Sequence, residues 1–185
     1  MQILLAVSKA IDAVNTGIGK TVRWLILVAV LVSAVNAIVR KAFSMSSNSW
    51  LELQWYLFGA VFMLCASYTL IRNEHIRIDL VAGRLSKRTR DWIDVIGHAV
   101  FLIPFALLLL VDSWPFFMRS WNINEQSSNA GGLPVWPAKF IILAGFFFLF
   151  LQGISELIKR IAVIRGDIPD PYETEVSPIV KEEAA

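Results

Sequence analysis

The chain has 185 residues, a length that suggests a single domain. Hydrophobic residues make up 56% of it and charged residues only 17%, whereas an ordinary soluble domain has about 25% charged residues. With twelve Phe and seven Trp as well, this composition excludes a small soluble domain, which could not bury so much apolar surface. We therefore expect an integral membrane protein. The net charge of +2 says little, because in such a protein the placement of charge matters more than its sum.

The first twenty residues predict an amphipathic helix rather than a secretion signal, because they lack a basic start and a small-residue cleavage site. Apolar residues at spacings of three and four share one helical face, and these are Leu4, Val7, Ile11, Val14 and Ile18. Polar residues lie away from that face, namely Ser8, Lys9, Asp12 and Asn15. Such a helix either lies flat on the inner membrane surface or docks a partner, and the sequence leaves both possibilities open.

Four apolar blocks approach the length needed to cross a bilayer, which is about 20 residues per helix. They cover residues 22–39, 50–71, 92–111 and 137–158. None alternates apolar with polar residues as a strand of a membrane barrel would. We therefore expect an all-α membrane protein with four transmembrane helices. Pro104 lies within the third block and is expected to kink that helix without ending it.

The basic residues predict which way the spans point. Lys and Arg gather before the first block, between the second and third, and after the fourth, twelve in all, against four on the opposite side. This positive-inside bias predicts that both termini are cytoplasmic. Residues 1–165 would then form the transmembrane domain, and the acidic, proline-containing residues 166–185 are expected to be a disordered tail.

Residues able to carry chemistry are scarce within the blocks, where polar groups would be expected near the midplane of a pump or carrier. Asp94 and His98 are four apart, share a helical face and are expected to form a polar clasp. Two histidines and one cysteine offer no ligand cluster for a metal or haem. No phosphate-binding loop or nucleophile motif occurs either. We therefore expect neither an enzyme nor a bound cofactor.

Two loops are distinctive. A polar cluster follows the second block and contains Arg72, His75, Arg77 and Asp79. It is either a topology signal that also binds anionic lipid headgroups or an ordered turn that contacts a partner subunit. The loop over residues 124–137 combines a glycine pair, which permits a tight turn, with prolines that stiffen its exit. It is either a rigid connector that seats the fourth span or a surface touched by partners.

These features together resemble one family. The sequence is similar to the small membrane subunit, or DctQ-like component, of tripartite ATP-independent periplasmic (TRAP) transporters, over about residues 1–165. The matching residues at the start of the second block are Trp50 and Glu52, and those of the turn after it are His75, Ile76, Arg77, Ile78 and Asp79. The outer loop and fourth block resemble the branch for mannitol or chloroaromatic compounds through Glu125, Ser127, Gly131, Gly132, Leu133, Pro134, Trp136, Pro137, Gln152, Gly153 and Glu156. One departure is that a single carboxylate, Glu52, opens the second block where two in succession are common.

The resemblance implies a scaffold subunit without a substrate site of its own, located in a bacterial inner membrane. A large permease subunit and a periplasmic solute-binding protein would be its partners, with membrane lipids around it and no nucleic acid. The transporter would import an organic acid with an ion gradient. Two alternatives remain, an autonomous small oligomeric carrier and a haem- or quinone-type membrane anchor. The residues expected to contact partners or lipid are Glu52, Arg72, His75, Arg77, Asp79, Glu125, Gly131, Gly132, Pro134, Trp136 and Glu156.

Overall fold

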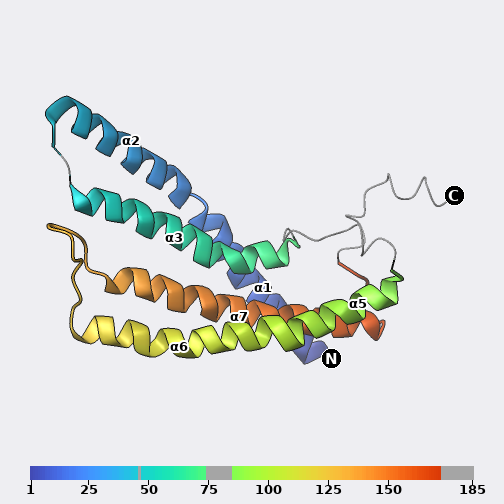
Figure 1. The fold of residues 1–185 in the computed structure, drawn as a ribbon. Coiled ribbons are helices and arrows are strands. Elements are labelled where there is room, and N and C mark those ends of the chain that lie inside the picture. The colour runs from blue at the N-terminus through green and yellow to red at the C-terminus, as the bar shows by residue number, and fades with distance from the viewer. Residues whose placement is uncertain (46, 74–84, 172–185) are drawn as a thin grey trace.

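The computed structural model describes residues 1–45, 47–73 and 85–171, which are helical apart from short connections. The helices are α1 (Gln2–Val22), α2 (Leu25–Phe43), α3 (Asn48–Ile71), α5 (Lys87–Ile96), a π-helical segment η1 (Gly97–Leu102), α6 (Ile103–Asn122) and α7 (Trp136–Ile164) (Figure 1). In these residues the only strand-like pairing is a single bridge between Gln126 and Pro134. The expected all-α class is confirmed.

Among the described residues, four helical stretches are long and apolar enough to cross a membrane, as expected. They run over residues 2–43, 48–71, 87–122 and 136–164. Each extends past the corresponding apolar block, since helical hydrogen bonding continues beyond the residues that match the hydrocarbon layer. The first stretch shows this most clearly, because α1 and α2 are separated only by a turn at Arg23 and Trp24.

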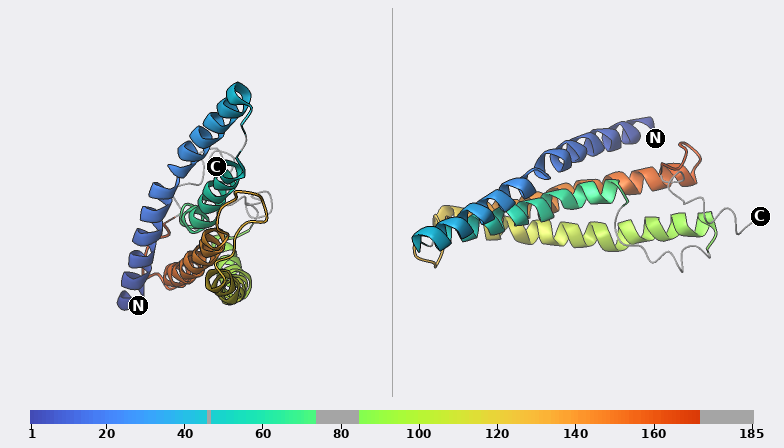
Figure 2. Two further views of the ribbon diagram at one scale, coloured as in Figure 1. Left: turned by 90° about the vertical axis from the view of Figure 1, so that its left-hand side faces the viewer. Right: turned by 90° about the horizontal axis from the view of Figure 1, so that it is seen from above.

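The long helices form an open row rather than a closed bundle. Along the row the order is α2, α3, α7 and α6, each in contact with the next, and Figure 2 shows this row in its end-on view. Helix α1 packs against both α3 and α7 near the end of the row that holds the N-terminus (Figures 1 and 2). We call this the inner end, and the end that holds residues 123–135 the outer end. Helix α7 holds the largest set of buried residues, whereas α2 has none.

Small residues let the central helices approach one another closely. A Cβ atom on Gly145 of α7 would lie 2.8 Å from Cβ of Met63 on α3, and one on Gly19 of α1 would lie 2.4 Å from Cγ of Tyr68. The buried apolar residues are also mostly small, namely Ala60, Ala106, Leu143 and Ala162. This is the packing expected in lipid, where close contact between helices replaces the hydrophobic effect as the source of association.

The third span continues through Pro104, as expected. Proline cannot donate a helical hydrogen bond and its ring crowds the carbonyl group four residues before it. The π-helical segment η1 ends two residues before Pro104, and such a segment widens the helix by one residue at the place where α-helical bonding is interrupted.

Helix α1 exists, but its polar side faces the other helices. Ser8 and Asn15 are each only 1% exposed, whereas Leu4, Val7 and Val14 are about half exposed. Placement of α1 flat on the membrane surface, and its alternative role in docking a partner, both stay predictions. The contacts nevertheless show that Ser8, Asp12 and Asn15 serve packing within the chain.

Candidate functional site

At the outer end of the row, the carboxylate of Glu52 is the centre of a hydrogen-bond cluster. Glu52 is only 6% exposed. Its oxygens accept hydrogen bonds from the hydroxyl of Ser127, from Nδ2 of Asn129 at 2.8 Å and from the backbone N–H of Leu133 at 2.6 Å. Hydrogen bonds to an ionised acceptor are stronger than neutral ones. One side chain of α3 therefore holds three points of a loop that lies about 80 residues further along the chain.

The first turns of α3 bind the loop carbonyls as well. Asn48 donates to the carbonyl of Ala130 at 3.0 Å, and Ser49 donates to that of Gly131. Two turns into α3, the Tyr56 hydroxyl donates to the carbonyl of Pro134 at 3.0 Å. Loop carbonyls need hydrogen-bond partners outside regular secondary structure, and these bonds hold the loop against α3 between Ser127 and Pro134.

The two glycines of the loop have different roles. Gly131 has φ +69°, a conformation that residues with a Cβ rarely adopt. Gly132 is required for space, because a Cβ there would lie 2.5 Å from Cβ of Ser127 and 2.7 Å from Oε1 of Glu52. The expected tight turn is present, and the second glycine is set against the carboxylate cluster.

We predict that Gly132→Ala destabilises the protein by about 1–3 kcal/mol, the usual range for overpacking a close contact. Gly17→Ala is the matched control, since nothing lies within 4 Å of a Cβ at Gly17 in α1. Unfolding by SDS in mixed micelles measures both variants. Equal stability of the two would contradict the steric role of Gly132.

A second carboxylate pairs with the start of α7. Glu125 accepts from Nζ of Lys139 at 2.5 Å, and the Lys139 ammonium also lies 4.2 Å from the ring centre of Phe116. This ammonium holds the pKa of the Glu125 carboxyl below its ordinary value of 4.5. Proton binding to Glu125 therefore opposes the loop structure. The contribution is complete above pH 4.5 and is lost as the pH falls through the lowered pKa.

This linkage predicts a pH-dependent difference between the protein and its Glu125→Gln variant. A spin label on Cys at Ser128, with Cys65 replaced by alanine, reports loop mobility. Above pH 4.5 the label should be more mobile in the variant, because Lys139 has lost its anionic partner. The difference should vanish at strongly acidic pH. A difference that persists unchanged at low pH would mean that the Glu125–Lys139 pair does not order the loop.

At the inner end, α1 and α7 are joined by a polar network. Gln152 is fully buried and accepts from Nδ2 of Asn15 at 2.7 Å while donating to Asp12 at 2.7 Å and Glu156 at 2.9 Å. The ammonium of Lys159 pairs with Asp12 at 3.0 Å and Glu156 at 2.6 Å. Hydroxyl contacts at 2.7 Å between Ser8 and Ser155 extend the network toward the N-terminus.

Next to this network, Arg160 joins α7 to two further segments. It is only 5% exposed, and its guanidinium lies 3.4 Å from Asp91 and 3.0 Å from Asp94 of α5. It also lies 3.5 Å from Asp170, beyond the end of α7, and Asp170 is 3.9 Å from Lys87. One guanidinium thus joins the inner ends of α5 and α7 to the residues that follow α7.

The expected Asp94–His98 clasp uses a different acceptor. Nδ1 of His98 lies 2.6 Å from the backbone carbonyl oxygen of Asp94, because the carboxylate of Asp94 turns to Arg160. Within the described residues, no group of three or more His, Cys, Asp or Glu side chains could hold a metal ion.

The residues singled out in the sequence fall into separate places. Near the outer end lie Glu52, Glu125, Gly131, Gly132, Pro134 and Trp136. Glu156 belongs to the inner network, and Arg72 ends α3 with its guanidinium 5.9 Å from the Tyr68 ring centre. His75, Arg77 and Asp79 lie outside the described residues. Contact of any of these residues with partners or lipid stays a prediction.

Sequence reasoning missed the inner partners. The sequence pattern places the polar residues of α1 away from its apolar face, and it names no partner for them within the chain. The signal that could have found them is a second polar face in the fourth span, made by Gln152, Ser155, Glu156 and Lys159 at helical spacing. A polar face on a helix beside a polar face on a membrane span indicates that the two pack together.

The two polar clusters stand at opposite ends of an apolar layer. From Phe140 to Leu151, α7 has no polar side chain. The described part of the chain thus has four membrane-length helices with polar clusters at their ends, the arrangement of a multi-pass membrane protein.

The family follows from comparison with known sequences. A family model described as "Tripartite ATP-independent periplasmic transporters, DctQ component" matches residues 29–163. The match covers most of the chain, and the chain belongs to this family of transporter components. Comparisons with curated proteins and with solved structures returned no match.

Proposed function

We propose that this protein is the scaffold subunit of a TRAP transporter that imports an organic acid across a bacterial inner membrane. Membership of the DctQ family makes it a small permease component. A large permease subunit would carry the moving transport site, a periplasmic protein would capture the solute, and an ion gradient would drive uptake. The substrate branch for mannitol or chloroaromatic compounds stays a prediction.

The main support for the scaffold role is that the polar groups bind other parts of the same chain. Glu52 binds the chain's own loop, and Gln152 and Arg160 bind other helices of the same chain. Between these clusters the row presents apolar side chains, including Phe58 and Phe62 of α3, each more than 70% exposed. Such a surface supports attachment within the membrane, whereas a carrier would need polar groups near the midplane.

The same arrangement supports an orientation. The inner end holds the N-terminus and the end of α7, and the basic bias of the sequence assigns that end to the cytoplasm. The outer loop would then face the periplasm, where a solute-binding protein could reach it.

Affinity purification from the native host tests the proposal. The tagged chain should co-purify with a larger membrane protein in fixed ratio, and deletion of the chain should abolish uptake of the solute. Liposomes that contain only this chain should not accumulate the solute. Full-rate uptake by such liposomes would overturn the scaffold role in favour of an autonomous oligomeric carrier. A haem absorption spectrum in the purified chain would favour a redox anchor instead.

A further inference from the structure

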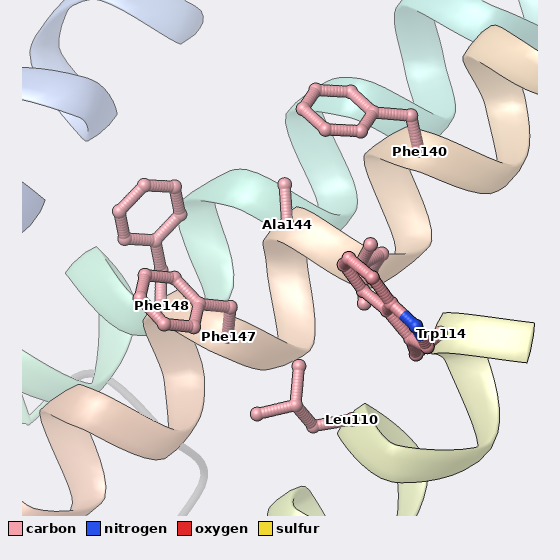
Figure 3. Close-up of a pocket in the computed structure, with 7 residues that line it drawn as sticks. Leu110, Trp114, Phe140, Ala144, Phe147 and Phe148 are labelled. Atoms are coloured by element: carbon pink, nitrogen blue, oxygen red, sulfur yellow. The ribbon is translucent and has the colours of Figure 1, made fainter. Parts of the chain in front are cut away.

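A groove of about 310 Å³ lies between α6 and α7, on the outer half of α7. Its lining is entirely apolar and consists of Leu110, Trp114, Phe140, Leu143, Ala144, Phe147 and Phe148. Figure 3 shows the small side chain of Ala144 between the rings of Phe140 and Phe148, with Trp114 and Leu110 reaching toward α7 from α6. None of these residues belongs to either polar cluster.

The groove is long in the direction of the helices. On α7 its lining runs from Phe140 to Phe148, which is about 12 Å at the helical rise of 1.5 Å per residue. A hole for one side chain of a packed helix would be about one turn long. The elongated shape instead suits a flexible chain that lies parallel to the spans, as lipid tails do.

The groove is continuous with the surface that meets lipid. Leu143 forms its floor and is 8% exposed, whereas Trp114, Phe140 and Phe147 form walls that are roughly half exposed. These walls are part of the apolar surface of membrane-length helices. Water does not fill an apolar cavity, and an empty groove would forfeit dispersion contacts along its whole lining.

We propose that this groove is a binding site for one acyl chain of a membrane phospholipid. The chain would lie against Leu143 and Ala144, between the walls given by Trp114 and Phe147. The site depends only on the membrane location of the protein, so it holds whether or not the scaffold role is correct.

The aromatic side chains above the groove set the direction of the lipid. Phe117 lies against Phe140 with ring centres 5.5 Å apart. One turn beyond Phe140, Trp136 meets Trp121 edge to face at 4.7 Å. Tryptophan rings favour the level of the headgroups, so this pair marks the outer interface. The headgroup would therefore lie toward Trp136 and the end of the acyl chain toward Phe148.

Filling the groove tests the site. Ala144→Phe places a ring in the groove, and Ala34→Phe adds the same ring on the exposed surface of α2. Both full-length proteins, with any subunits that co-purify, are reconstituted with phosphatidylethanolamine and phosphatidylglycerol. They are then washed with mild detergent and examined by native mass spectrometry. The wild type and A34F should retain a phospholipid that A144F loses.

Thermal unfolding in lipid-free detergent distinguishes a filled groove from a damaged fold. A ring that replaces the acyl chain should keep or raise the unfolding midpoint of A144F, whereas misfolding would lower it. If A144F retains the phospholipid as the wild type does, the site is wrong. It is also wrong if a photo-crosslinker at residue 144 joins another protein instead of a lipid, since the groove is then a protein interface.

Discussion

Arg160→Gln is expected to destabilise the protein by about 3–5 kcal/mol, the usual effect of removing one partner from a buried ion pair. The reason is that Asp91, Asp94 and Asp170 would all lose the guanidinium that they share at the inner end. Stability is measured as the free energy of unfolding by SDS in mixed micelles. Hydrogen exchange should also increase in α5, because the ion pairs of Asp91 and Asp94 with α7 are lost.

Two control variants distinguish the effect of burial on stability from the effect of charge. Arg165→Gln removes a guanidinium that is 63% exposed and paired with Asp167 at 3.2 Å, and exposed pairs contribute only about 0–1 kcal/mol. Arg160→Lys keeps the charge but loses the planar fork that reaches several carboxylates, so it should have an intermediate effect. Equal stability of the Arg160→Gln and Arg165→Gln variants would show that the Arg160 contacts do not hold the inner end together.

Glu52→Gln is expected to release the outer loop while leaving the row of helices folded. A carboxamide has one acceptor oxygen, and its NH2 group would face donors that now bind the carboxylate, including the N–H of Leu133. Amide hydrogen exchange over residues 125–135 should become many-fold faster, and the unfolding midpoint should fall by several degrees. Under the proposed function, uptake should also fall sharply, because the loop would no longer be held in one shape.

Glu125→Gln is the matched comparison, because it removes a carboxylate from the same loop. The Glu125 side chain is 33% exposed, so its loss should loosen the loop less than the loss of Glu52. If Glu52→Gln leaves exchange at Leu133 unchanged, the carboxylate is not what orders the loop.

The number of spans and their helical structure could be predicted, because each span corresponds to one continuous apolar block. Their order in the row could not, since a block that is apolar all round gives no preferred side. Helix α2 illustrates this, because it has no buried residue to mark the face that meets α3. Only close contacts such as Gly145 with Met63 decide the neighbours, and these depend on residues far apart in sequence.

Part of the outer cluster could be predicted from the sequence. Glu52 and the glycine pair were singled out as candidates, and the positive φ of Gly131 agrees with the predicted turn. The bond from Ser127 to Glu52 could not be predicted, because it joins residues 75 positions apart. The inner network was harder to predict, because Asn15 and Gln152 look like unrelated surface residues until α1 is placed beside α7.

The open row also determines which part of the protein separates first. Helix α2 stands at one margin, has no buried residue and continues from α1 through the turn at Arg23 and Trp24. Local opening is expected where few residues are buried, so we expect α2 to separate from α3 before α3, α7 and α6 separate from one another. A thinner bilayer or a harsh detergent should thus displace α2 at one margin of the molecule under milder conditions than those that separate the central helices.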